Sequence, residues 1–407
     1  MMTQSADQAW RARRALAVSV ALFGVTGLAP RAPGDPLDGT CGGSAALRDR
    51  SRLTAHPALL DARAELPAPW QDDAAGGGGG ALLAPDPPEV TPATRAAIDR
   101  GLRYLARTQN RDGSWRTQGS TGGYPTAMTA LAGLAMLGSG STPTQGPYSR
   151  NVSGAMTFLL KSARRDGLIA QLEEESHCMH GHGFAMLFLA EVFGMEEDAQ
   201  RQAQIKLALQ RAIELTARSQ SAAGGWLYTP DSGGDEGSVT VTQVQGLRAC
   251  RNVGIAVPKR VIDNALRYLE KSANDDGGIR YQVSDNGPSR PAITAAAVAC
   301  WYNAGQYEDE HARKALAFVE RTLSPRNPDA SRYFGHYFYA HLYMAQVMFI
   351  TGEKKWDDYF PAIRDILLDK QSEDGSWDGD HVGSTYGTSV ALLVLQLPYK
   401  NLPIMQR

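Results

Sequence analysis

Two kinds of helix alternate along the chain after about residue 93, and they differ in how their apolar residues are spaced. One kind has an apolar stripe at helical spacing and a polar opposite face, as in residues 94–108 and 261–271. The other kind is apolar nearly all round, as in residues 127–137, 184–190 and 390–395. A helix with one polar face lies at the surface, whereas a helix without one is buried. The pattern therefore predicts an outer and an inner layer of helices.

A glycine-rich turn stands between each outer helix and the inner helix that follows it. The clearest turns have glutamine six residues before tryptophan, at 109–115, 220–226 and 371–377. Weaker copies at 166–169 and 276–279 have isoleucine in place of the tryptophan, and the spacing leaves room for a degenerate copy near Pro328. A repeat of about 50 residues marks one structural unit that cannot bury its apolar face alone. The turns therefore predict six helix pairs.

The ends of this series decide how the six pairs assemble. An open array needs polar capping units, and neither end of the series reads as one. We therefore predict an all-α fold, an α6/α6 toroid of six helix-pair repeats over residues 93–407. In such a ring the turns and the starts of the inner helices gather at one end, which we call the mouth.

The first part of the chain has a different composition. Within residues 1–29, three arginines precede an apolar run that begins at Ala15 and is shorter than the roughly 20 residues that span a bilayer. We interpret this segment as a signal peptide or an anchor, which predicts export to the periplasm or beyond, with membrane association through this segment only. Residues 30–92 are rich in Pro, Gly and Ala and are predicted to form a flexible linker.

Charge and cysteine content exclude several classes of protein. The formal net charge of the 407 residues is −2, so the sequence predicts no nucleic-acid partner. The four cysteines include no Cys-x-x-Cys pair and indicate no disulfide scaffold. Residues 177–182 hold three histidines and a cysteine, which are ligand types that zinc or copper accepts. Their spacing matches no closed metal site, and we predict neither a metal nor a cofactor.

The Gln-x-x-x-Gly-x-Trp turns, their period and the apolar inner helices resemble the prenyltransferase and squalene-cyclase repeat. This repeat is found in triterpene cyclases and in the β subunits of protein prenyltransferases, and the resemblance covers about residues 90–405. It implies the ring fold and a small hydrophobic molecule or isoprenoid as ligand. A protein partner cannot be named from the sequence. Because one fold carries many chemistries, activity has to be argued from the site.

The mouth is the predicted site, because polar and aromatic residues concentrate in the segments that lead into the inner helices. We predict that substrate contacts come from these positions: His180, His182, Thr240, Tyr333, His336, Tyr337, Asp380, His381 and Tyr386.

The resemblance to squalene-type cyclases implies a carboxylic acid that protonates an alkene, held in an Asp-x-Asp-Asp motif at the start of an inner helix. The closest match places Glu236 as the proton donor, beside Asp235, with Ser238 in place of the motif's threonine. Gly234 and Gly237 stand where the motif has its other aspartates. Glu236 and Asp235 are therefore the candidate catalytic acids of an enzyme whose activity the sequence leaves open.

Three other functions follow from the same resemblance or the same ring. A zinc prenyltransferase is rejected, because Gly387 stands where the last inner helix needs a histidine ligand. A noncatalytic exported toroid would bind a hydrophobic ligand or a protein partner. A carbohydrate-active α6/α6 enzyme would use paired carboxylates such as Glu236 and Asp380. An aromatic-lined pocket with Glu236 pointing inward would favour cyclisation, and a filled ring would favour binding alone.

Overall fold

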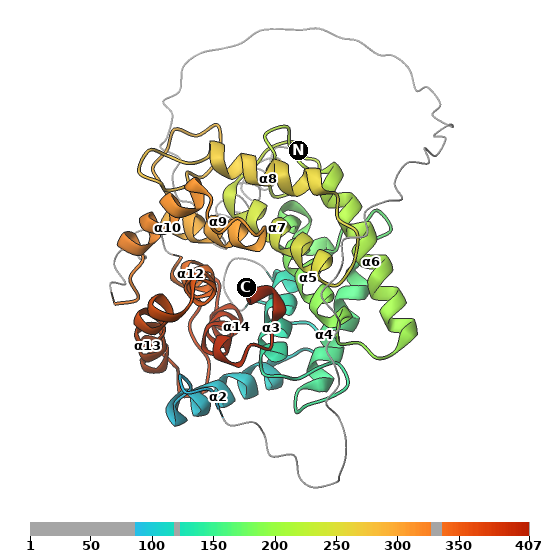
Figure 1. Cartoon of the computed structure of the whole chain (residues 1–407). Helices are drawn as coiled ribbons and strands as arrows, with labels where there is room; N and C mark the ends of the chain where they lie inside the picture. The colour runs from blue at the N-terminus through green and yellow to red at the C-terminus, as the bar shows by residue number, and fades with distance from the viewer. Residues whose placement is uncertain (1–85, 118–122, 327–335, 407) are drawn as a thin grey trace, which may run out of the picture. The chain divides into compact units, whose positions relative to one another are not determined.

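A computed structural model describes residues 86–117, 123–326 and 336–406 (Figure 1). The predicted signal peptide or anchor, most of the predicted linker, and the degenerate turn near Pro328 lie outside these ranges. No helix within them is long and apolar enough to cross a bilayer.

The helices alternate between two layers, as the apolar pattern predicts. The inner helices are α3 (Pro125–Gly138), α5 (Cys178–Phe193), α7 (Gly237–Asn252), α9 (Pro291–Asn303), α12 (Tyr337–Thr351) and α14 (Ser384–Leu395). The outer helices are α2 (Pro92–Thr108), α4 (Ser149–Ser162), α6 (Ala199–Arg218), α8 (Lys259–Lys271), α10 (Glu310–Thr322) and α13 (Glu353–Asp369). Nearly every residue of α3, α5 and α9 is buried, whereas α2 and α8 bury one stripe each.

The inner helices close into a ring. Each packs against the next in chain order, and the last, α14, packs against the first, α3 (Figure 1). In the outer layer α13 likewise contacts α2. The predicted all-α α6/α6 toroid is confirmed. All six inner helices start at the same end of the ring, because each is reached through a turn from an outer helix.

Hydrogen bonds explain why the turns contain tryptophan. The indole N–H groups of Trp115, Trp226 and Trp377 donate to carbonyls ten residues back in the outer helix, over 2.9, 2.8 and 2.7 Å. All three rings are buried. The tryptophans therefore fix the angle between each outer helix and its turn, and none of them is available to line a groove.

The glutamines of the same turns join one repeat to the next. Gln109 Nε2 donates to the Asn151 carbonyl of α4 over 2.9 Å. Gln220 donates to Val261 of α8 in the same way. Gln371, in the last repeat, donates to the Ala97 carbonyl of α2, the first helix, over 2.9 Å. The motif that identifies the repeat thus also closes the ring.

The C-terminal segment lies against the far ends of the inner helices. Two short 3-10 helices, η2 (Leu397–Tyr399) and η3 (Pro403–Met405), follow α14, and η3 contacts α7. Gln346 of α12 donates to the Ile404 carbonyl over 3.1 Å, and the segment is drawn in dark red toward the middle of the ring in Figure 1. The end of the ring opposite the mouth is therefore covered by the chain itself.

The first described residues fall within the range that composition assigns to the linker. Residues 86–92, assigned to the linker from composition, include the buried Val90 and the first residue of α2. Asp86 accepts hydrogen bonds from Arg95 and from the Tyr399 hydroxyl, over 2.8 and 2.9 Å. The ordered domain therefore begins before residue 93.

Candidate functional site

Glu236 is the residue immediately before α7, and its side chain caps that helix. The carboxylate accepts hydrogen bonds from the backbone N–H groups of Ser238 and Val239 over 3.0 and 2.6 Å, and from the Ser238 hydroxyl over 2.7 Å. Its exposed fraction is 0%. A buried carboxylate is expensive unless it is hydrogen-bonded, and the start of a helix supplies free N–H donors and a partial positive charge.

His180, from the first turn of α5, faces the same carboxylate. Its Nε2 atom lies 3.5 Å from Glu236 Oε1 and 3.0 Å from the Ser238 hydroxyl oxygen. Burial lowers the pKa of His180 well below its usual value, and the nearby His177 lowers it further. The imidazole is therefore neutral, and its Nε2 atom bonds to the Ser238 hydroxyl, which in turn donates to Glu236.

The surroundings of Glu236 favour its protonated form near neutral pH. Burial raises the pKa of Glu236 to about 7, against the opposing effect of the hydrogen bonds from Ser238 and Val239. Asp235 adds a smaller increase through its negative charge. A carboxyl with such a pKa holds a proton below pH 7 and has its donors already in place to stabilise the anion after the proton leaves.

Tyrosines from three parts of the chain surround this acid. Tyr228 and Tyr281, from the turns that lead into α7 and α9, share a short hydrogen bond between their hydroxyls. Tyr339 and Tyr343 of α12 are fully buried, with ring centroids 4.9 Å apart. The charge of Glu236 contributes to the raised pKa of Tyr339, which places that ring near the acid. The interior beside Glu236 is thus filled by aromatic side chains.

Tyr386, a predicted substrate contact, joins this aromatic interior from α14. Its ring is buried, and its hydroxyl has no hydrogen-bond partner among the described residues. Such a hydroxyl is unusual in a native interior. The Tyr386 hydroxyl is therefore one of the buried groups in this interior that could bond to a polar group of a ligand.

Asp235 does not share the environment of Glu236. It is partly exposed, and its carboxylate accepts from the Val283 N–H over 3.3 Å, in the next turn of the ring. The two predicted acids therefore point to different neighbours. Glu236 faces the interior, whereas Asp235 ties one turn to the next.

His182 and Thr240, both predicted substrate contacts, serve the repeat turns instead. The Thr240 hydroxyl accepts from the Trp226 N–H over 3.1 Å, and His182 Nδ1 accepts from the Ile169 N–H over 3.1 Å. Thr129, Thr294 and Thr388 accept from Trp115, Ile279 and Trp377 in the same way. His182 thus takes the place that a threonine has in four other repeats, and the polar atoms of His182 and Thr240 bond to turn N–H groups.

The remaining predicted contacts form a second group around α12. Asp380 accepts from the Phe338 N–H over 3.1 Å and so caps α12, and burial raises its pKa to about 6. His336 precedes this helix, and burial lowers its pKa to about 4. Tyr337 lies under the Lys370 ammonium of the outer layer, 4.3 Å from ring centroid to Nζ, and His381 is exposed. Of this second group, Asp380 and His336 are partly buried polar groups at the mouth.

Tyr333, the last predicted contact, lies outside the described residues.

Glu174 is a buried acid that sequence reasoning missed. Its exposed fraction is 3%, and it accepts from the Thr126 N–H of α3 over 2.9 Å and from the Gln171 N–H over 3.1 Å. The run of acids at 173–175, directly before an inner helix, was the signal that could have identified it.

The three histidines of residues 177–182 do not converge. His177 Nδ1 lies 2.9 Å from the Ser176 hydroxyl oxygen, while His180 faces Ser238. His182 Nε2 lies 3.1 Å from the Thr216 hydroxyl oxygen, toward α6. The imidazoles therefore have three separate sets of partners, which gives no shared position for a metal.

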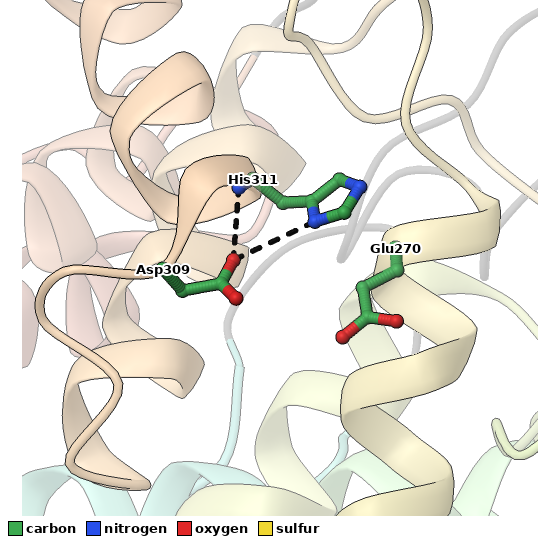
Figure 2. Close-up of side chains that lie close together, drawn as sticks. All are labelled: Glu270, Asp309 and His311. Carbon is green, nitrogen blue, oxygen red and sulfur yellow. Dashed lines mark hydrogen bonds and ion pairs between the residues drawn. The ribbon is translucent and has the colours of Figure 1, made fainter.

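One other group has ligand-type atoms close together, in the outer layer. Figure 2 shows Glu270 near the end of α8 and Asp309 and His311 at the start of α10, with ligand atoms within 4.8 Å of one another. Asp309 is the cap of α10 and accepts from the His311 and Ala312 N–H groups over 2.8 and 3.2 Å. Helix capping accounts for this arrangement, and we assign no ion to it.

A sequence relative and several solved structures resemble this chain, although no family model matches it. A drimenyl diphosphate synthase of Streptomyces showdoensis is 26% identical over 232 residues, which are 57% of this chain and 39% of that protein. The chain thus spans well under half the length of this relative.

The solved structures support the fold. A type II terpene cyclase of Scytonema, MstE, in complex with merosterolic acid A, has a TM-score of 0.53 at 15% identity and covers 78% of this chain and 99% of its own. The same enzyme in complex with geranylgeranyl dihydroxybenzoate has a TM-score of 0.51 at 17% identity, with the same coverage of both chains. An α-1,6-mannanase of Salegentibacter sp. HEL1_6 has a TM-score of 0.55 at 9% identity, and the match covers 76% of this chain and 99% of the mannanase. At these identities the likeness concerns the toroid itself.

Proposed function

We propose that this terpene cyclase-like protein, which has the α/α toroid of the terpenoid cyclases, starts the cyclisation of an isoprenoid by proton transfer from Glu236. The observation that carries the proposal is the state of that carboxyl. It is fully enclosed, sits at the start of an inner helix and has a pKa raised by burial to about 7. An acid of this kind is about half protonated at pH 7, more fully protonated at lower pH, and shielded from water.

In the proposed step the carboxyl proton of Glu236 moves to a terminal alkene carbon. The alkene π pair forms the new C–H bond, and the adjacent carbon becomes a cation that the next double bond of the same molecule attacks. The Glu236 carboxylate left behind keeps its hydrogen bonds to Ser238 and Val239. The reaction ends when the last cation loses a proton to a base.

Two features of the site replace parts of the family motif. Gly234 and Gly237 stand where the resemblance would place further aspartates. The Ser238 hydroxyl and the neutral His180 instead hold the Glu236 carboxylate from two sides. The faces of Tyr339 and Tyr343 supply the electron-rich surface that stabilises carbocations by cation–π contact.

Access to Glu236 requires a side chain to move, because no part of it is exposed. A surface groove of about 1060 Å³ runs beside the start of α5, where Leu168, Leu172 and Cys178 lie among mostly polar and charged lining residues. Leu172 is 76% exposed, which is unusual for a large apolar residue. This groove is the candidate route for an apolar substrate toward His180 and Glu236.

The test is turnover by the full chain. It is incubated with squalene, farnesyl and geranylgeranyl diphosphates and geranylgeranyl dihydroxybenzoate, and products are separated by mass-detected chromatography. We expect one of these to give a cyclic product, and Glu236→Gln to lower the rate at least about 1000-fold, since it removes the proton donor. Asp235→Asn, the matched control, retains turnover. Unchanged turnover by Glu236→Gln would remove Glu236 from the mechanism.

Binding without turnover is the second candidate function, and the filled interior is the observation that favours it. If the chain binds these isoprenoids but forms no product under any of the conditions, the toroid is a binding protein. The carbohydrate-active reading has the fold of the mannanase in its favour. It needs two carboxylates that reach one substrate and water, whereas Glu236 is enclosed and Asp380 caps α12.

A further inference from the structure

A second concave site lies at the opposite end of α7 from Glu236. A cavity of about 100 Å³ is enclosed by the last turns of α7, the first turns of α8 and the residues that end α9. Along α7, Arg248 is twelve residues beyond Glu236, which corresponds to about 18 Å of helix. The cavity is therefore separate from the mouth.

The wall of this cavity is apolar at its base and cationic at its edge. The apolar side chains are Val244, Leu247, Val257, Ile262 and Leu266, and the cationic ones are Arg248, Arg251 and Lys259. Lys259 is held by Asp263, with Nζ to oxygen distances of 2.7 and 2.8 Å. That pair neutralises itself, so the two arginines determine the charge of the opening.

The two arginines lack a counter-ion within the part of the chain that the structure describes. Neither Arg248 nor Arg251 forms an ion pair with a carboxylate of the described residues. Burial lowers the pKa of Arg248, and the charge of Arg251 lowers it further. The end of α7 accounts for one basic residue, because the last turn of a helix carries partial negative charge. It does not account for a second, half-buried cation that faces a cavity.

Asn303 provides an independent indication of a ligand. It lines the cavity, its side chain is 5% exposed, and its amide Nδ2 has no hydrogen-bond partner among the described residues. Buried amide donors in native proteins are almost always paired. Among the described residues, this donor and the two neighbouring cations all lack a partner, which indicates a missing acceptor.

We propose that this cavity binds a small organic anion, whose carboxylate or phosphate head lies between Arg248 and Arg251. The guanidinium groups donate to the head, and the Asn303 amide donates to a ligand oxygen. An apolar group of a few carbons occupies the base against Leu247 and Leu266. The volume is too small for an isoprenoid chain, so this ligand differs from the proposed substrate.

Binding is measured by calorimetric titration of the full chain with butyl phosphate and butanoate, and with inorganic phosphate and butanol as the two halves of the ligand. We expect one of the two amphiphilic anions to bind at least tenfold more tightly than inorganic phosphate, and butanol not to bind. Which of them binds more tightly distinguishes a phosphate from a carboxylate ligand. No binding of either anion overturns the proposal.

The variants test the residues. Arg248→Gln should weaken binding of the better anion at least about tenfold, because it removes a charge-assisted hydrogen bond. Arg260→Gln, an exposed cation of α8 outside the cavity, should leave binding unchanged. If both variants weaken binding equally, the anion associates with surface charge in general, and the proposed site is wrong.

Asn303→Leu separates a ligand role from a structural one. An apolar residue of similar volume removes the unpaired donor, so the free protein should keep or gain thermal stability while anion binding weakens several-fold. A lower melting temperature with undiminished binding would show that Asn303 serves the fold. Glu236→Gln should not change anion binding, so failure at the mouth and failure here are distinguishable.

Discussion

Glu236 and Glu174 are both buried acids at the mouth, and they differ in what surrounds them. Glu174 accepts from groups of α3 and of its own segment, chiefly Thr126 and Gln171, and so joins two neighbouring elements. Glu236 caps its own helix and also faces His180 and the aromatic interior. Burial raises the pKa of both. Burial and helix capping therefore do not by themselves identify a catalytic acid. What distinguishes Glu236 is that it also faces His180 and the aromatic interior.

The largest expected effect is on turnover, which should depend on Glu236 and not on Glu174. Glu236→Gln should abolish turnover, by about 1000-fold or more, while its folding is retained. Glu174→Gln should keep turnover per folded molecule but destabilise the domain by about 1–3 kcal/mol, because the new amide cannot accept from all three former donors, the Thr126 N–H, the Thr126 hydroxyl and the Gln171 N–H. Rates and urea unfolding of the two variants test this. Equal losses of turnover would show that both acids only support the mouth.

The second effect concerns pH and again singles out Glu236. Its pKa is about 7 folded and about 4.5 unfolded, so the folded state binds the proton more tightly. Wild-type stability therefore falls by about 3 kcal/mol as pH rises from 4.5 to 7, and then changes no further through this group. Relative to wild type, Glu236→Gln should gain that amount over the same range.

Urea unfolding at several pH values measures this gain, with Asp263→Asn, an exposed-pair control, as the comparison. A difference between Glu236→Gln and wild type that does not change with pH would mean that the carboxyl is already ionised at pH 4.5. Turnover by wild type should in parallel decline above pH 7, where the donor has lost its proton.

The third effect compares two histidines of α5. His180→Asn should lower kcat about tenfold with little change in KM and shift the alkaline limb of the pH profile, because it alters a direct neighbour of Glu236. His182→Thr introduces the residue that four other repeats have at this position, and it should retain kcat at a modest loss of stability. Equal kcat losses in the two variants would contradict the separate roles.

The smallest effect concerns the turns, far from the acid. Gln371→Ala removes the hydrogen bonds that join the last repeat to the first, and Gln109→Ala removes the equivalent pair within the ring. Each should cost about 1–2 kcal/mol of unfolding free energy, without a change in turnover per folded molecule. A far larger loss for Gln371→Ala would show that ring closure carries more stability than any other repeat contact.

The sequence predicted the ring because its signals are periodic. Apolar spacing distinguishes inner from outer helices, and the Gln and Trp of each turn form the same bonds wherever they occur. The site was harder, because the same positions at the mouth serve two purposes. His182 and Thr240 look like cavity residues in the sequence, yet their polar atoms receive turn N–H groups.

The approach of Glu236 and His180 could not be derived from the sequence, since they lie on different helices and 56 positions apart. Asp235 shows that residues adjacent in the sequence can likewise have different partners in the structure. It adjoins Glu236 in sequence, but helix geometry turns the two side chains toward different neighbours, and Asp235 accepts from Val283. Orientation at a helix start depends on which N–H groups are free, which only the assembled ring determines.

The most direct test of the central claim is the origin of the initiating proton. The full chain, equilibrated in deuterium oxide, is incubated with the isoprenoid that it converts, and the cyclic product is examined by mass and NMR spectroscopy. If Glu236 initiates the reaction, the product carries one deuterium at the carbon that was the terminal alkene, and Glu236→Gln forms none of it. A cyclic product without that deuterium, or one that Glu236→Gln forms at the wild-type rate, would contradict the claim.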